Sequence, residues 1–116
     1  MQIQVNTDDH IEGRDALSAH VEREVKETLA RFSDRVTRVE VHLGDENAGK
    51  AGSADKRCMM EARPTGQPPM SVTQHAATLD EALTGALRKL KTVLESKFSQ
   101  LHDHKGSPSI RDIARS

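Results

Sequence analysis

The sequence predicts an α+β domain whose four strands and two helices follow one another in the order β-α-β-β-β-α. Four segments alternate polar and apolar residues, which is the period of a strand with one buried face. Two longer segments repeat apolar residues every three or four positions, which is typical of an amphipathic helix. A chain of 116 residues is long enough for one domain and too short for two separate cores.

The first strand and the first helix are predicted in the N-terminal third of the chain. Ile3 and Val5 alternate with polar neighbours over residues 1–6. Residues 7–9 then supply a threonine and two aspartates, which favour a turn and the start of a helix. A helix is predicted over residues 14–32, where one apolar stripe contains Leu17, Val21, Val25, Leu29 and Phe32.

Three further strands are predicted between residues 36 and 76. In the second strand the apolar side is formed by Val39, Val41 and Leu43. Residues 44–54 are rich in Gly, Asp, Glu, Asn and Lys and should form a mobile hairpin tip. In the third strand, Cys58, Met60 and Ala62 should point inward, and Arg57, Met59, Glu61 and Arg63 outward. Residues 64–69 hold three prolines and a glycine, a strong turn signal, before a fourth strand with Met70, Val72 and Gln74 inward.

The last predicted element is a long helix. Thr78 is a suitable N-cap, and Glu81 three residues later completes the sequence of a capping box. The apolar stripe contains Leu79, Leu83, Leu87, Leu90, Leu94, Phe98 and Leu101, widened by Ala82 and Ala86. We therefore predict one domain over residues 1–101 and a flexible C-terminal tail over residues 102–116, because the tail has little apolar content.

The way in which successive elements connect predicts the topology of the sheet. A strand-helix-strand unit closes right-handed, so its two strands should be parallel, and the hairpins that follow add antiparallel strands. The alternating strands offer only one apolar face, so both helices should cover the same face. The predicted fold is a four-stranded mixed sheet with two helices packed on one face.

Composition excludes several classes of protein. No run approaches the ~20 apolar residues of a membrane span, and residues 1–6 lack the pattern of a signal sequence, so a cytoplasmic protein is expected. Cys58 is the only cysteine. A single cysteine excludes an internal disulfide and a multi-cysteine zinc site. Because Cys58 lies in a predicted strand, we expect it to be a small buried hydrophobic side chain.

Neither metal binding nor catalysis is indicated. His102 and His104, with Asp103 between them, come nearest to a ligand cluster, but no further His or Cys is close in sequence, so no cofactor is predicted. His42 and His75 fall on the outward faces of their strands. They are expected simply to occupy a solvated face, and a pH-sensitive pair of neighbours is the alternative. There is no local nucleophile-base motif and no glycine-rich phosphate loop, so the protein is not predicted to be an enzyme.

Basic residues collect on the last helix. The formal net charge is −1, which by itself does not favour nucleic-acid binding. Positive charge nevertheless gathers on the polar side of the second helix at Arg88, Lys89 and Lys91. If the helices lie side by side, Arg23 and Lys26 of the first helix could join these three in one basic stripe that faces phosphate, although Glu22, Glu24 and Glu27 are interleaved there.

The sequence resembles the family of ribosome hibernation-promoting factors and ribosome-associated inhibitors, formerly called sigma-54 modulation proteins. The resemblance spans most of residues 1–101 and is carried by residues 1–3 (Met-Gln-Ile), 15–17 (Asp-Ala-Leu) and 34–36 (Asp-Arg-Val), the strand after them, and the spacing of residues 82–94. The final helix departs from the family pattern at Thr92, Val93, Glu95 and Ser96, where relatives carry basic or polar residues. The chain is therefore identified as a diverged member.

The resemblance implies a binding function with no catalysed reaction. Members of that family bind the small ribosomal subunit in its decoding channel and hold ribosomes inactive in stress or stationary phase, and basic residues of their final helix contact ribosomal RNA. The positions expected to bind RNA here are Arg23, Lys26, Arg88, Lys89 and Lys91. The alternative is a protein-interaction module on the same fold that has lost ribosome binding. Its expected contact regions are the exposed Met59, the open sheet face and the tail. Neither implies a small-molecule substrate or a membrane, and self-association is left open.

Overall fold

The computed structural model describes residues 1–8, 14–45 and 56–106, and side chains as far as residue 100. It confirms the α+β class and the element order. The strands and helices are β1 (Gln2–Thr7), α1 (Arg14–Thr28), β2 (Val36–Asp45), β3 (Lys56–Pro64), β4 (Met70–Ala76) and α2 (Leu79–Gly106).

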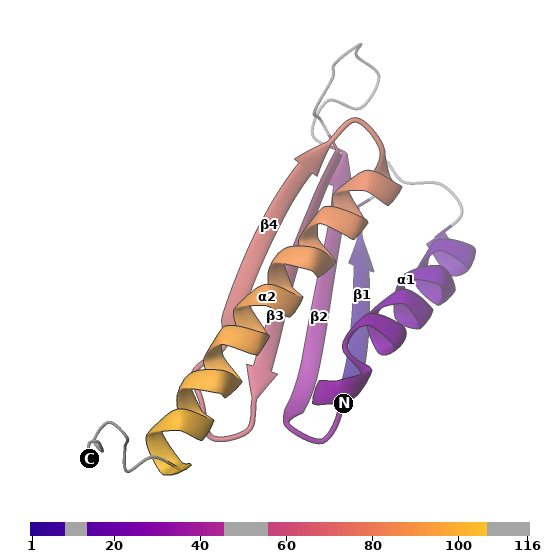
Figure 1. The fold of residues 1–116 in the computed structure, drawn as a ribbon. Coiled ribbons are helices and arrows are strands. Elements are labelled where there is room, and N and C mark those ends of the chain that lie inside the picture. The colour runs from indigo at the N-terminus through magenta and orange to yellow at the C-terminus, as the bar shows by residue number, and fades with distance from the viewer. Residues whose placement is uncertain (9–13, 46–55, 107–116) are drawn as a thin grey trace.

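The four strands form one mixed sheet in the order β1-β2-β3-β4. β1 is parallel to β2, whereas β3 is antiparallel to both of its neighbours. Figure 1 shows α1 and α2 side by side on the same face of this sheet, with α2 crossing it diagonally. The predicted topology is therefore confirmed, and the opposite face of the sheet carries neither helix.

The core lies between this sheet and the two helices. Inward-pointing residues of the central strands are fully buried, among them Val39, Val41, Cys58, Met60 and Ala62. From the helices, the buried side chains are Val21, Val25, Ala82, Leu83, Ala86, Leu87, Leu90, Leu94 and Phe98. The predicted inward register of β2 and β3 and the predicted apolar stripes are confirmed as far as residue 100.

The first helix is shorter than predicted. α1 ends at Thr28, and residues 30–32 form a separate 3₁₀ turn. The backbone N–H of Leu29 still donates to the Val25 carbonyl at 2.9 Å, but that of Phe32 donates to Leu29, only three residues back. This tighter turn seats the Phe32 ring 5.4 Å from that of Phe98. Apolar spacing alone does not distinguish a continuous helix from this arrangement.

The hairpin tip predicted over residues 44–54 begins too early. Gly44 and Asp45 belong to β2, where they pair with Arg57 and Lys56 of β3. The Lys56 ammonium lies 3.3 Å from the Asp45 carboxylate, which ties the two strands together beyond their last apolar pair. Backbone pairing does not require an apolar period, so the strand continues into polar sequence. Residues 46–55 lie outside the described residues, and the mobility of the tip stays a prediction.

The turn between β3 and β4 has a defined form. The Gln67 N–H donates to the Pro64 carbonyl at 3.2 Å, and Gly66 between them has φ = 72°. A positive φ at the third position is the requirement of a type II turn, which glycine meets without strain. The predicted turn signal is confirmed, except that β3 itself includes Pro64.

The second helix begins where the sequence predicts. The Thr78 hydroxyl accepts a hydrogen bond from the Glu81 N–H at 3.1 Å, so Thr78 is the N-cap. A Cβ on Gly85 would lie 2.6 Å from Cγ of Gln74, so the absence of a side chain lets α2 approach β4 closely. α2 runs to Gly106, five residues beyond the predicted domain boundary. Residues 107–116 are outside the described residues, and flexibility of the tail stays a prediction.

Cys58 makes the stability of the fold depend on pH. Burial raises the pKa of its thiol to about 12, from an ordinary value of 9.0. In the unfolded chain the thiol ionises above pH 9, whereas in the folded chain it stays neutral. The free energy of unfolding should therefore fall above pH 9 by about 1.4 kcal/mol per pH unit. Urea unfolding at pH 7, 9 and 10 should show this fall in the wild type and a smaller one in Cys58→Ala. An equal fall in the free energy of unfolding with pH in the wild type and in Cys58→Ala would contradict this prediction.

Candidate functional site

The outward surface of the helical layer is where the two helices meet. Near the start of α2, Nε2 of His20 lies 3.6 Å from the Asp80 carboxylate. Further along, Nη1 of Arg31, just after α1, lies 3.0 Å from the Glu95 carboxylate of α2. These exposed pairs contribute little stability individually, but they mark the two ends of the seam between the helices. Between them the seam is open.

A groove of about 220 Å³ occupies the middle of this seam. Its walls are Glu24 and Thr28 from α1, and Thr84, Leu87, Arg88 and Lys91 from α2. Arg88 is exposed and Lys91 is partly exposed, so two cations face the solvent along one side of the groove. Among the residues that the structure describes, Glu24 is the only acid that lines the groove. Its carboxylate partly neutralises Arg88 and Lys91, so the positive potential in the groove is lower than two cations alone would give.

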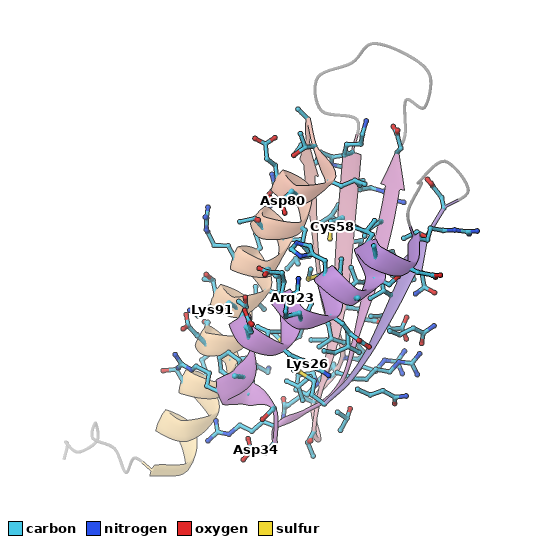
Figure 2. The ribbon with its side chains drawn as sticks, turned by 90° about the vertical axis from the view of Figure 1, so that its right-hand side faces the viewer. Arg23, Lys26, Asp34, Cys58, Asp80 and Lys91 are labelled. Atoms are coloured by element: carbon cyan, nitrogen blue, oxygen red, sulfur yellow. The ribbon has the colours of Figure 1, made fainter. Side chains whose placement is uncertain are left out.

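Arg23 and Lys26, which Figure 2 labels, are both exposed on α1. Neither residue lines the groove. Successive residues of an α-helix are rotated by about 100° around the helix axis. Glu24 faces α2, so Arg23 lies on the side of α1 that faces away from the sheet. Lys26 lies about 200° from Glu24, on the side of α1 away from α2. Nη2 of Arg23 is 3.3 Å from Nδ1 of His20. Arg23 is thus directed back toward the His20–Asp80 pair.

Lys89 lies on the other flank of α2, next to the outer edge of the sheet. Its ammonium donates a hydrogen bond of 2.8 Å to the backbone carbonyl of Thr73 in β4. β4 is an outer strand of the sheet. Gln74 similarly donates to the carbonyl of His75 at 3.0 Å. A side chain from a neighbouring helix that binds the backbone of an outer strand helps to cover that edge, so Lys89 has a structural role in this conformation.

The structure places three of the five predicted RNA-binding residues next to one another. Arg88 lines the groove with Lys91 and, on its other side, a hollow of about 560 Å³ with Lys89. Arg23 lies beside the groove, and Lys26 lies on the far flank of α1. Asp80 and Glu81 balance the two cations of the larger hollow, and the exposed Glu22 and Glu27 alternate with the cations of α1. Cations outnumber acids in the groove, which can therefore attract a polyanion by charge.

Two findings concern other kinds of site. Among the described side chains there is no group of three or more His, Cys, Asp or Glu residues that could hold a metal ion. The side chains of His102 and His104 are outside that set. No helix in the described part of the chain is long and apolar enough to cross a membrane.

The open face of the sheet is expected as a contact region only under the alternative of a protein-interaction module, and the sequence places its residues correctly. Arg38, Glu40 and His42 of β2 lie beside Arg63, Glu61 and Met59 of β3. Glu40 pairs with both Arg38, at 3.0 Å, and His42, at 3.4 Å. The signal available in the sequence was a charged residue at nearly every outward position of two strands. A solvated face has the same pattern, so the signal was not distinctive.

His42 and His75 are not neighbours, so the pH-sensitive pair that the sequence left open does not form. His42 is opposite Met59 and His75 is opposite Arg57. The two histidines thus lie on strands separated by β3 and on different rows. Neighbouring strands are about 4.8 Å apart, so these rings do not form a pair. The predicted order of hairpins already places β3 between the two histidines, and the strand register adds that they lie on different rows.

A further hollow, of about 410 Å³, lies near the end of the described part of α2. The guanidinium of Arg35 lies over the Phe98 ring at 5.1 Å, and that of Arg31 lies over Phe32 at 4.9 Å. Asp34 and Glu95 also line it, so its charges balance. The balance of charge makes it a weaker candidate for an anion than the groove.

Comparisons with known proteins identify relatives of this chain. Residues 3–102 match the sequence pattern of a family described as Sigma 54 modulation protein / S30EA ribosomal protein. A sequence search of curated proteins finds no match. Among solved structures, the N-terminal domain of Protein Y from Thermus thermophilus is similar, with a TM-score of 0.66 and 23% identity over 83% of this chain and 98% of that one. A ribosomal subunit interface protein from Coxiella burnetii has a TM-score of 0.61 and 16% identity over 85% and 99%. At these identities the likeness shows a shared fold.

Proposed function

The chain belongs to the Sigma 54 modulation protein / S30EA ribosomal protein family, and from this membership we propose that it associates with the ribosome in the cytoplasm and inhibits translation. The match covers residues 3–102, which include the described strands from Ile3 onward and nearly all of α2. The solved protein from Coxiella burnetii that shares its fold is described as a ribosomal subunit interface protein. These findings support a ribosomal partner.

The finer part of the proposal concerns the contact surface. Small-subunit RNA binds the helical layer, with Arg88 and Lys91 as the central contacts and Arg23 beside them. The observation that supports this is the groove, where two cations of one helix face the solvent 3 residues apart with a single acid opposite. Lysine and arginine bind phosphates by charge and release counterions as they do so.

The remaining cations contribute less. Lys26 points to the far flank of α1, so it contacts RNA only if the nucleic acid wraps that side. Lys89 must give up its bond to the Thr73 carbonyl before its ammonium can reach a phosphate. We therefore expect Arg88 and Lys91 to account for most of the electrostatic contribution to binding. The protein acts by occupying a surface on the ribosome, with no cofactor and no small-molecule substrate.

The proposal is tested by sedimentation of the full chain with purified small subunits. At about 50 mM salt the protein should sediment with the subunit, and the bound fraction should fall steeply by about 200 mM, since each phosphate contact adds to the salt dependence. Purified large subunits and 16-nucleotide single-stranded RNA are the comparison samples.

Each outcome is informative. Absence from the small-subunit fraction at low salt would overturn the proposed function and favour the protein-interaction module. Binding that is insensitive to salt would retain the ribosomal partner but overturn the RNA contact through basic residues. Equal binding to both subunits and to the short RNA would reduce the contact to a general affinity for polyanions.

A further inference from the structure

The open face of the sheet carries two adjacent bands of opposite charge that run across the strands. Arg38 of β2 lies opposite Arg63 of β3, and we call these two residues the Arg band. Two residues along each strand, Glu40 lies opposite Glu61, and these form the Glu band. All four side chains are partly exposed, from 18% for Glu40 to 50% for Arg63. Both helices lie on the other face (Figure 1).

Within one molecule this arrangement is only partly favourable. Opposite charges meet along the strands, at 3.0 Å for Arg38 with Glu40 and 3.6 Å for Arg63 with Glu61. Like charges, however, stand directly opposite across the strands, which is destabilising in a sheet. An alternative pattern, with Arg opposite Glu on neighbouring strands, would avoid this repulsion. The open face can therefore bind a second surface on which the Arg band and the Glu band lie in the reverse order.

A second copy of the same chain offers that reverse order. We propose that two molecules associate through their open sheet faces, about a twofold axis that runs parallel to the bands and between them. Rotation by half a turn about this axis exchanges the positions of the two bands. The Arg band of each molecule then lies over the Glu band of the other. In this arrangement β2 faces β2 and β3 faces β3, so Arg63 meets Glu61 of the second copy.

The resulting contact is self-complementary, as a twofold interface must be. Each glutamate gains a second arginine, and each arginine a second glutamate, so the like-charge neighbours are separated by opposite charges from the other molecule. The face is only four strands wide, at about 4.8 Å per strand, and its contacts are polar. Such an interface is at the small end of specific interfaces, so the dimer is weak and concentration-dependent.

This association leaves the helical layers on the two outer surfaces of the dimer. The groove with Arg88 and Lys91 stays open to solvent in both copies, so the inference does not depend on the proposed function. Charge complementarity also predicts sensitivity to salt, because the Debye length falls to about 3 Å at 1 M. Sedimentation-velocity centrifugation of the full chain should show the monomer–dimer equilibrium at low salt and the monomer alone at 1 M.

A charge-swap experiment on β3 identifies the interface. Arg63→Glu places two acids over two acids in the homodimer, and Glu61→Arg places two cations over two cations. Each variant alone should dimerise at least roughly tenfold more weakly, because apposed like charges are strongly unfavourable. In an equimolar mixture the acidic pair of one chain meets the basic pair of the other, and dimerisation should return. Both residues are partly exposed, and circular dichroism checks that each variant is folded.

The control is Arg88→Glu, which makes the same charge change on the helical layer and should leave dimerisation unchanged. A wild-type chain that stays monomeric at low salt up to the highest soluble concentration would overturn the proposal. So would a dimer that persists in both single variants, or a mixture that does not recover it. An effect of Arg88→Glu equal to that of Arg63→Glu would show that net charge, and not the bands, governs association.

Discussion

Leu90→Ala is expected to lower the free energy of unfolding by about 2–5 kcal/mol. Leu90 is fully buried in the middle of α2, where the helix packs on the sheet. Truncation removes apolar contacts and leaves a cavity that the surrounding strands cannot fill, because protein interiors are close-packed. The core contains only two phenylalanine rings, both toward one end, so aliphatic side chains supply most of the buried volume. The effect is measured by urea unfolding followed by circular dichroism.

Leu79→Ala is the matched control for this cavity. It removes the same atoms from the first turn of the same helix, where Leu79 is only partly buried. We expect a clearly smaller loss there, because the site is partly hydrated already. Equal losses at the two positions would contradict the description of Leu90 as a central core residue. The comparison also separates the intrinsic helix preference of alanine, which favours both variants, from the cost of the cavity.

Arg88→Gln combined with Lys91→Gln is expected to cause the largest loss of ribosome association. If each cation contacts one phosphate, each charge-assisted hydrogen bond is worth about 1.5–3 kcal/mol, which is roughly tenfold or more in affinity. The salt dependence should also weaken, by about one unit in the slope of log K against log salt for each lost contact. Glutamine keeps the approximate length and polarity of both side chains, so the fold should be retained. Sedimentation with small subunits over a range of salt concentrations measures both quantities.

Two further variants make this result specific. Glu24→Gln removes the acid that faces Arg88 and Lys91 in the groove, and should strengthen binding. Arg63→Gln removes one cation from the open sheet face and should leave binding nearly unchanged. A double variant that sediments as the wild type would move the RNA contact away from the groove. Equal losses from the double variant and from Arg63→Gln would indicate a response to net charge alone.

Much of the fold could be predicted because burial imposes a period on the sequence. Ile3, Val5, Val39, Val41 and Leu43 alternate as a one-sided sheet requires. The errors fall where that constraint is absent. Gly44 and Asp45 extend β2 through backbone pairing, which leaves no apolar signal. The end of α1 at Thr28 is set by how Phe32 reaches Phe98, a contact between residues that are far apart in the sequence.

The candidate site was less predictable, because surface side chains carry no such period. The sequence identified Arg88, Lys89 and Lys91 as one cluster, since they are neighbours in the chain. In the structure Arg88 and Lys91 line the seam with α1, whereas Lys89 bonds to the edge of β4. Residues one or two apart on a helix face different directions. Their environments depend on which elements flank the helix.

Residue order is enough to predict the α+β class, the order of the elements, the one-sided sheet and the buried faces, because hydrophobic burial constrains each of these locally. Which charges meet is set by the folding of the chain in three dimensions. The approach of α2 to β4 at Gly85, the placing of Glu24 beside Arg88 and Lys91, and the two charge bands all depend on packing distance and strand register. Electrostatic interaction depends on separation in space, which residue order does not specify, so the surfaces proposed here for RNA and for a second copy became visible only in the folded chain.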